Sequence, residues 1–167
     1  MLLNEITSSD QPEIMVLVGL PGSGKSTFIK QLKSEKKYVV VSTDDIFEQL
    51  AKDAGVNYTQ AFNTFPYKEV EREMFSSLNK ALSRRDNIIV DQTNMTVKSR
   101  NRKLSMVPTG YKKIAVVFSV DEAELQRRLV AREKTEGKSI PKSVISSMKS
   151  SYQAPTKSEG FDEIIHV

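Results

Sequence analysis

The segment 19–26, with the sequence GLPGSGKS, contains the residues of this chain that are best suited to chemistry. Gly19 is followed by four variable residues and then by Gly24, Lys25 and Ser26, which is the G-x-x-x-x-G-K-[ST] pattern of phosphate-binding loops. In such a loop, backbone N–H groups surround the phosphate oxygens, the lysine reaches the terminal phosphates and the hydroxyl binds Mg²⁺. A glycine turn that merely joins a strand to a helix is the alternative interpretation.

The residues around this loop favour the phosphate-binding interpretation. The apolar run 14–18 precedes it and is typical of a buried parallel strand. Residues 27–33 follow it with apolar side chains at helical spacing, which predicts a helix. A helix that starts at the loop adds positive potential where an anion would bind.

Two acidic segments follow predicted strands, and in a parallel sheet ligands bind beyond the carboxyl ends of the strands. Asp44 and Asp45 come directly after the strand expected at 38–42. We predict that Asp44 is a general base toward a hydroxyl and that Asp45 has a secondary role. A helix cap is the alternative for Asp44, but Thr43 could supply that cap.

Asp91 closes the apolar run 88–90 and opens the segment DQTN. Its place at a strand end predicts an acid that holds Mg²⁺ directly or through water. A residue that forms the turn at the strand end is the alternative. With Ser26, Asp91 is therefore our candidate magnesium ligand.

A basic helix is expected after Asp121. Arg128 and Arg132 are four residues apart, so both lie beside the apolar stripe of this helix, whereas Arg127 points to roughly the opposite side. Two inward arginines near a phosphate loop could neutralise charge on a transferring phosphoryl group. A salt-bridged helix face is the alternative. The polar segment 135–139 predicts the tip of a mobile lid.

For two weaker signals, a structural role is the first interpretation and a functional role is the alternative. Four aromatic residues after the second helix could stack on a base, but core packing is the simpler expectation; they are Tyr58, Phe62, Phe65 and Tyr67. A basic helix face is expected to be solvated, with nucleic-acid contact as the alternative; it contains Lys98, Arg100, Arg102 and Lys103.

Strands and helices alternate along the chain, which predicts an α/β fold with a parallel sheet covered by helices on both faces. The expected strands are 14–18, 38–42, 87–91, 114–120 and 164–167. The expected helices are 27–33, 44–54, one from about 66, 97–106, one capped by Asp121 and Glu124, and one starting at Pro141. The segment that carries Tyr58, Phe62 and Phe65 is expected to be a connection.

Composition agrees with a compact enzyme domain. The chain has 167 residues, 38% of them apolar, no cysteine and a formal net charge of +4. We expect residues 1–12 to be flexible and 13–167 to form a single domain. No apolar stretch is long enough for a membrane span. The absence of cysteine excludes a disulfide framework and a thiolate nucleophile and suits a reducing compartment.

The chain resembles the 5′-hydroxyl polynucleotide kinases, a branch of the small P-loop kinases found in bacteriophage and animal end-healing enzymes. The resemblance extends from about residue 14 to 167. It rests on the phosphate loop, the TDD segment at 43–45, the DQTN segment with Arg100 downstream, Arg128 and Arg132 before Ile140 and Pro141, and the segments YQAP at 152–155 and EGF at 159–161.

The resemblance implies a P-loop kinase fold with a small arginine-bearing lid, and it assigns roles to individual residues. The implied ATP-binding residues are Gly22, Ser23, Gly24, Lys25, Ser26 and Thr27 on the phosphates and Arg128, Ile140 and Pro141 beside the adenine. Lys25, Asp44 as general base and Arg132 as the lid arginine are the implied catalytic residues. Asp44, Thr93, Asn94 and Arg100 are the implied acceptor-binding residues.

One position departs from the family pattern. The phage kinase has an arginine three residues after the catalytic aspartate, and this chain has Phe47. If the acceptor is a polynucleotide, other cations must hold its backbone, and Arg100 is the leading candidate.

The predicted function is therefore an ATP- and Mg²⁺-dependent transfer of a phosphoryl group to a hydroxyl, with a 5′-OH end of DNA or RNA as the expected acceptor. A kinase of a nucleoside, modified base or other small hydroxyl compound and an ATP-binding switch module are the alternatives. We expect a cytoplasmic protein, in the host cytoplasm for a phage-encoded chain. DNA or RNA preference and oligomeric state stay open.

Overall fold

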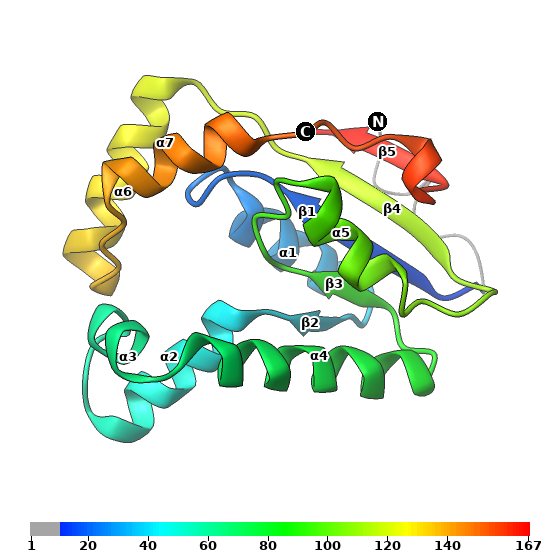
Figure 1. Cartoon of the computed structure of the whole chain (residues 1–167), viewed down its shortest axis with the longest axis horizontal. Coiled ribbons are helices and arrows are strands. Elements are labelled where there is room, and N and C mark those ends of the chain that lie inside the picture. The colour runs from blue at the N-terminus through cyan, green and yellow to red at the C-terminus, as the bar shows by residue number, and fades with distance from the viewer. Residues whose placement is uncertain (1–10) are drawn as a thin grey trace.

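The computed structural model describes residues 11–167 and contains a five-stranded sheet (Figure 1). The strands are β1 Glu13–Val18, β2 Val39–Val41, β3 Ile88–Val90, β4 Lys112–Val117 and β5 Glu163–His166. They lie in the order β2-β3-β1-β4-β5, and each neighbouring pair is parallel. The predicted α/β fold with a parallel sheet is confirmed. Residues 1–10, which make up most of the segment expected to be flexible, lie outside the described residues.

β1 lies at the centre of the sheet, and every residue in it is buried. It pairs with β3 on one side, where Ile14 is opposite Ile88, and with β4 on the other, where Ile14 is opposite Lys113. A strand buried on both faces needs a continuous apolar run, which 14–18 supplies. Glu13 is buried as well, and its carboxylate accepts a hydrogen bond from the Tyr38 hydroxyl.

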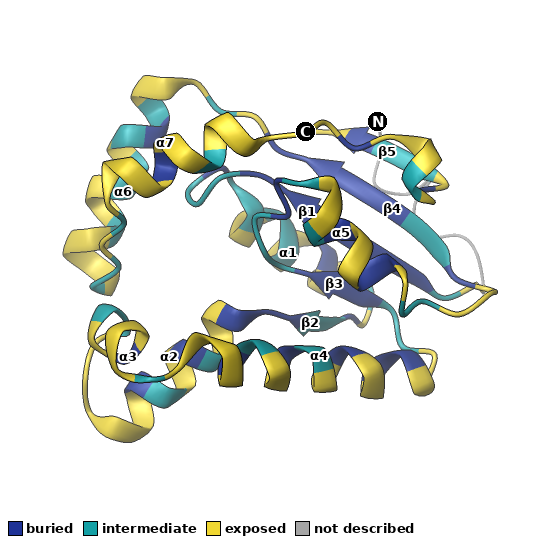
Figure 2. Cartoon of the chain, in the orientation of Figure 1, coloured by how far each residue is buried: buried dark blue, intermediate teal, exposed yellow. Residues whose placement is uncertain are grey.

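Helices cover both faces of this sheet (Figures 1 and 2). The helices are α1 Lys25–Glu35, α2 Thr43–Ala54, α3 Tyr58–Thr64, α4 Tyr67–Ser83, α5 Val97–Leu104, α6 Glu122–Glu136 and α7 Lys142–Ser151, with a 3₁₀ turn at Lys157–Glu159. Side chains alternate across β1, so Met15 packs in one core cluster with Leu32 of α1. Ile14 packs in the other with Met74 of α4 and Leu104 of α5.

The last two α-helices form an arm at one side of the sheet (Figure 1). α6 and α7 lie side by side, and the N-terminal ends of α2 and α3 face this arm across the carboxyl edge of the sheet. The arm is the element on which the sequence places Arg128 and Arg132. Within residues 11–167, no helix is both long and apolar enough to cross a membrane.

The segment between α2 and α4 differs from the expected connection because it contains helix α3. Asn57 and Gln60 form a full capping box there: each side chain binds the backbone N–H of the other residue, at 2.9 Å in both cases. This reciprocal pair satisfies N–H groups that a short helix otherwise leaves free. The capping pattern was present in the sequence and is the signal that identifies the helix.

Three local predictions need correction. Strand β4 ends at Val117 rather than residue 120, because its neighbours β1 and β5 end opposite that residue. The cap of α2 is Ser42, whose hydroxyl accepts from the Asp45 N–H at 3.3 Å, and Thr43 is already helical. Asp121 caps α6, but Glu124 pairs with arginines instead of completing a capping box.

A buried ionic network ties the chain after β3 to the C-terminal segment. The Arg100 side chain is fully buried and pairs with Glu159, with Nε 2.7 Å and Nη2 3.1 Å from the carboxylate oxygens. Its Nη1 donates to the Asn94 carbonyl at 2.9 Å, and Lys103 Nζ donates to the Asn94 side-chain oxygen at 2.8 Å. Burial also lowers the pKa of Lys103 to about 8.

This network predicts that Arg100 is needed for stability. Breaking a buried ion pair leaves one charge uncompensated, so Arg100→Met should lower the free energy of unfolding by roughly 3–5 kcal/mol. Burial acts to raise the pKa of Glu159, but hydrogen bonds from Arg100 hold it below its usual value of 4.5. The pair therefore stabilises the protein at neutral pH, and this contribution is lost progressively as the pH falls from about 4.5 through the lowered pKa of Glu159. Urea unfolding of the wild type and Arg100→Met at pH 7 and pH 3 measures this contribution. An equal difference in the free energy of unfolding between the two proteins at both pH values would contradict the assignment.

Candidate active site

The loop between β1 and α1 has the geometry of an anion cradle. Gly22 and Gly24 adopt positive φ angles of 82° and 106°, a backbone conformation that side chains disfavour. α1 begins at Lys25 with no side-chain cap and no acidic residue in its first turn. Its N-terminal N–H groups and helix dipole are thus left to an anion. This geometry fits the phosphate-binding role predicted for residues 22–27.

Two polar side chains of the loop could bind a phosphate. Lys25 Nζ is folded back on the loop, where it donates to the carbonyls of Gly19 at 2.7 Å and Leu20 at 2.9 Å. The Ser23 hydroxyl is buried and has no hydrogen-bond partner among the described residues. A buried polar group without a partner costs free energy, and a bound phosphate oxygen would remove that cost.

Charges of opposite sign meet at Lys25. Burial lowers the pKa of Lys25 to about 8, Asp91 and Asp44 oppose this shift, and Arg132 adds to it. Burial likewise raises the pKa of Asp91 to about 6, and Lys25 opposes that shift. Four charged side chains from separate elements therefore act on one another beyond the carboxyl edge of the sheet.

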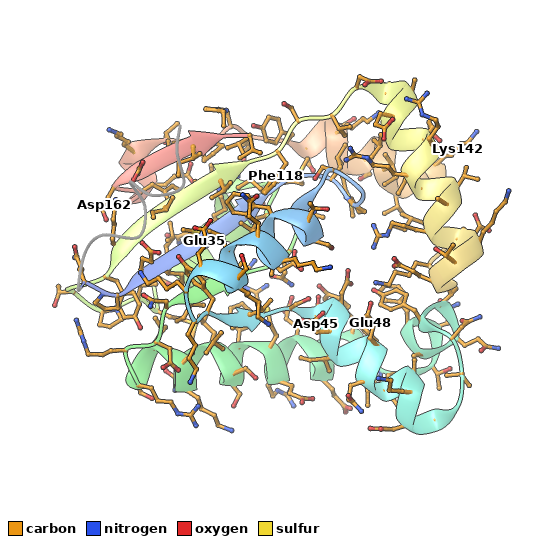
Figure 3. The ribbon with its side chains drawn as sticks, turned by 180° about the vertical axis from the view of Figure 1, so that it is seen from behind. Glu35, Asp45, Glu48, Phe118, Lys142 and Asp162 are labelled. Atoms are coloured by element: carbon orange, nitrogen blue, oxygen red, sulfur yellow. The ribbon has the colours of Figure 1, made fainter. Side chains whose placement is uncertain are left out.

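The structure separates the two neighbouring carboxylates of α2. The Asp44 carboxylate accepts a hydrogen bond of 2.6 Å from the Tyr58 hydroxyl of α3. Its charge acts on Lys25 and Asp91. Burial raises the pKa of Asp45, and the charge of Glu48, one turn further along α2, raises it further. Figure 3 shows both Asp45 and Glu48 on the side of α2 that faces the arm.

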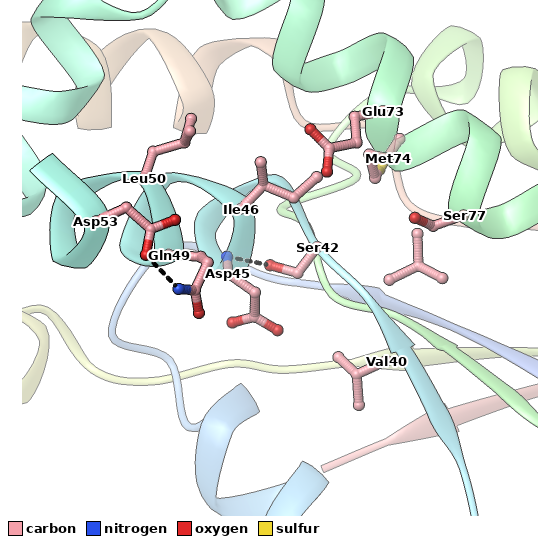
Figure 4. A pocket seen from close by; sticks show the side chains of 11 residues that line it. Val40, Ser42, Asp45, Ile46, Gln49, Leu50, Asp53, Glu73, Met74 and Ser77 are labelled. Carbon is pink, nitrogen blue, oxygen red and sulfur yellow. Dashed lines mark hydrogen bonds between the residues drawn. The ribbon is translucent and has the colours of Figure 1, made fainter.

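Asp45 also lines a pocket that lies away from the phosphate loop (Figure 4). The pocket has a volume of about 310 Å³ between β2, α2 and α4, and residues such as Ile46, Met74 and Ser77 line it. Asp44 does not line this pocket. The geometry is consistent with Asp44 as the carboxylate directed at the reaction and Asp45 as a residue with a secondary role.

The arginines of α6 differ in exposure as the helical period predicts. The Arg127 side chain is 69% exposed, against 41% for Arg128 and 24% for Arg132. Arg128 lies on the phosphate loop: its Nη1 donates to the Gly22 carbonyl at 3.1 Å, and its Nε to Glu124 at 2.9 Å. Arg132 is 3.8 Å from Glu136.

The tip of the arm contacts α3. The Thr59 hydroxyl donates to the Gly137 carbonyl at 2.5 Å and accepts from the Ser139 N–H at 3.2 Å. Lys138 pairs with Glu48, and its Nζ lies 5.1 Å from the centre of the Tyr58 ring. The segment predicted to be a lid tip thus bridges to the acceptor side of the site.

Two side chains expected on the acceptor side, those of Arg100 and Asn94, have structural roles. Arg100 is buried against Glu159, so it cannot hold a nucleic-acid backbone as expected. Asn94 is 1% exposed, and its Nδ2 donates to the Leu17 carbonyl at 2.7 Å. The Thr93 carbonyl accepts from the Gly19 N–H at 3.0 Å, which fixes the phosphate loop to the chain after β3.

Phe47 points into the protein and is fully buried. It occupies the position where the family has an arginine, but here it supports the aromatic side chains of the next two helices. Of the residues expected beside adenine, Ile140 is half-buried and Pro141 is the exposed cap of α7. Their assignment to the nucleotide stays a prediction.

The residues present fit a magnesium ion that is held together with a nucleotide. No cluster of three or more metal-ligating side chains occurs within residues 11–167. Mg²⁺ usually keeps several waters and is bound by one or two protein groups plus substrate phosphates. Ser26, at the start of α1, and Asp91, after β3, are the two groups that the fold supplies at this edge.

Comparisons with known proteins agree with this geometry. The model of the AAA domain family matches residues 14–155. Heterogeneous nuclear ribonucleoprotein U-like protein 2 of Homo sapiens is 29% identical over 163 residues, which cover 94% of this chain and 22% of that protein. The bifunctional polynucleotide phosphatase/kinase of Schizosaccharomyces pombe is 25% identical over 164 residues, covering 95% of this chain and 34% of that protein. The chain thus spans between 22% and 34% of the length of these relatives.

A solved structure of the Pnkp1/Rnl/Hen1 RNA repair complex contains a similar chain. It superposes with a TM-score of 0.68 at 28% identity, covering 88% of this chain and 46% of that one. The similarity covers most of residues 11–167.

The contacts of α6 predict that Arg128 contributes to triphosphate binding. Arg128→Ala removes a cation that touches the phosphate loop, so it should weaken ATP affinity, by about tenfold for a charge-assisted contact. Arg127→Ala is the matched control, because Arg127 shares Glu124 as partner but is exposed. Isothermal titration with ATP measures the affinity of both variants. Equal losses in the two variants would exclude a specific role for Arg128.

Proposed function

The chain belongs to the AAA domain family and is a P-loop kinase similar to polynucleotide kinases, and on that premise we propose that it transfers the γ-phosphate of ATP to the 5′-OH end of a nucleic acid. The observation that carries this proposal is that Lys25 follows β1, Asp44 follows β2 and Asp91 follows β3 at one edge of the sheet, where the charges of Asp44, Asp91 and Arg132 act on Lys25. These residues are a phosphate-binding cation, a candidate general base, a candidate metal ligand and a lid arginine.

The proposed reaction assigns one task to each group. The acceptor hydroxyl gives its proton to the Asp44 carboxylate while its oxygen attacks the γ-phosphorus. The bond from the γ-phosphorus to the oxygen bridging to the β-phosphate breaks, and ADP leaves. Lys25 and Arg132 stabilise the negative charge on the transferring group. Ser26 and Asp91 would hold Mg²⁺, which would neutralise phosphate charge when bound.

Tyr58 has a supporting role in this scheme. Its hydroxyl donates to Asp44 at 2.6 Å, which fixes one carboxylate oxygen and leaves the other for the acceptor. Burial raises the pKa of Tyr58, so its hydroxyl stays protonated and is the donor toward the Asp44 carboxylate. Tyr58 is thus a positioning residue, and it also lies under Lys138 of the lid tip.

The names of similar proteins support a nucleic-acid end as the acceptor. One relative is a polynucleotide phosphatase/kinase, and the similar solved chain comes from an RNA repair complex. A small hydroxyl compound on the same scaffold is the alternative acceptor. An ATP-binding module without an acceptor is a further alternative, because another relative is named only as a ribonucleoprotein. The position of Asp44 favours transfer over binding alone.

The test is transfer of labelled phosphate from ATP to a panel of acceptors. The panel contains 5′-OH DNA and RNA oligonucleotides, free nucleosides, a modified-base DNA and small alcohols, with Lys25→Ala as the inactive control. Labelled 5′ ends on oligonucleotides would support the proposal. Labelling of nucleosides, modified bases or alcohols alone would move the function to a small-molecule kinase. ATP hydrolysis with no labelled acceptor would support the switch module.

The assignment of the general base predicts unequal effects of two conservative substitutions. Asp44→Asn keeps the shape but cannot accept a proton, so transfer should slow by about 10²–10⁴ with little change in ATP affinity. Asp45→Asn is the matched control and should be mild, because Asp44 rather than Asp45 binds the Tyr58 hydroxyl and acts on Lys25. Rapid-quench measurement of transfer gives both rates. A damaging Asp45→Asn with a mild Asp44→Asn would show that the base is Asp45.

The lid arginine predicts an effect on kcat rather than on binding. Arg132→Ala removes a cation whose interaction strengthens as charge moves to the leaving group, so kcat should fall by about 10²–10³. The KM for ATP should change little. Steady-state kinetics beside Arg127→Ala provides the comparison. A rise in KM at constant kcat would assign Arg132 to ground-state binding.

A further inference from the structure

Four aromatic rings form a cluster beside Asp44, which we call the aromatic platform: Phe47, Tyr58, Phe62 and Tyr67. Phe47 is buried beneath the other three, with ring centres 5.1 Å from Phe62, 6.0 Å from Tyr58 and 6.2 Å from Tyr67. Phe62 and Tyr67 are each 45% exposed, and their ring centres are 6.3 Å apart. Core packing thus explains Phe47 but leaves two large rings open to solvent.

The platform is attached to the candidate base through Tyr58, whose hydroxyl donates to the Asp44 carboxylate at 2.6 Å. The charge of Asp44 reaches both tyrosines and raises their pKa values, although burial is the larger cause. A hydroxyl group that reaches Asp44 therefore brings the rest of its molecule over these rings.

Three cations that could hold an acceptor phosphate are already paired. Lys138 binds Glu48, and Arg102 binds Glu71 at 3.0 Å. Arg100 is buried against Glu159. Since the proposed function assigns Lys25 and Arg132 to the phosphates of ATP, the platform presents the acceptor with aromatic faces beside paired charges. Such a surface suits a flat, uncharged group better than a phosphate.

We propose that the exposed rings of Phe62 and Tyr67 bind the unpaired base of the acceptor's terminal nucleotide. Stacking on an aromatic face accepts any base, because every base has a π-face, and it requires a base that is not paired in a duplex. The acceptor is then selected by its terminal base and single-stranded character instead of its backbone phosphates. This inference rests on the proposed function and specifies the acceptor of the same site.

The test compares two single-stranded oligonucleotides that differ only at the 5′-OH nucleotide, thymidine in one and an abasic tetrahydrofuran residue in the other. In wild type, loss of the base should raise KM by at least about fivefold, the lower limit for one stacked base, with little change in kcat. Phe62→Ala should raise KM for the thymidine end and leave the abasic end unchanged. Phe62→Trp should retain the preference for the base. Equal KM values for the two ends in wild type would overturn the proposal.

Two controls separate stacking from other effects. Tyr152 at the end of α7 is exposed to a similar degree, 41%, so Tyr152→Ala should preserve the preference for the base. Salt is the second control, because each neutralised phosphate of a single strand adds about 0.7 to the slope of log affinity against log salt. If stacking dominates, the slope should be smaller than the value for one phosphate contact. A slope that corresponds to several phosphate contacts would show recognition through phosphates.

A failure of this inference can be told from a failure of the proposed function. If both ends are phosphorylated with equal KM, the proposed kinase function stands and the role of the platform is excluded. If neither end is phosphorylated, the proposed function fails, and fluorescence anisotropy with the same two labelled oligonucleotides tests the platform directly. Base-dependent binding that Phe62→Ala abolishes would then support it, whereas base-independent binding or no binding would overturn it.

Discussion

The parallel pairing of β1 between β3 and β4 is the constraint on which the site depends. Since every strand runs in the same direction, every carboxyl end lies at one edge of the sheet. The phosphate loop leaves β1 there, Asp44 follows β2 and Asp91 follows β3. A hydrogen bond from Gly19 to Thr93 then joins two of these segments directly. An antiparallel β3 would carry Asp91 to the far end of the molecule.

Sequence patterns predicted most of this framework because it depends on local signals. The continuous apolar run of β1 and the glycine that ends α2 each specify an element without reference to distant residues. Helix α3 was not predicted, although its capping residues Asn57 and Gln60 stand three positions apart in the sequence. The end of β4 was misplaced because Phe118–Val120 is compatible with a strand, and only the lengths of its neighbours end it at Val117.

The candidate site was harder to predict where a residue's role depends on a distant partner. From the sequence, Arg100 was expected on a solvated basic face. It is buried because it pairs with Glu159, fifty-nine positions away in the chain. The role of Asn94 was hard to predict for the same reason, because its partners are Leu17 and Lys103. Arginines 128 and 132 were easier, because helical period alone fixes their side of α6. Phe47 shows that a substitution at a family position can change the whole neighbourhood, with an aromatic cluster in place of one cation.

The hydrogen bonds between the arm and α3 depend on a side chain at one end and on backbone groups at the other. Thr59 contributes a side chain, whereas the arm contributes the carbonyl of Gly137 and the N–H of Ser139. Since every amino acid except proline supplies both backbone groups, position 139 can drift through evolution while these bonds persist. Thr59 has less freedom, because its side chain must both donate and accept, which a hydroxyl does with a single atom. Gly137 is also constrained, since its φ of 66° favours glycine. Across homologous chains, the contact would then be conserved at positions 59 and 137, while position 139 varies.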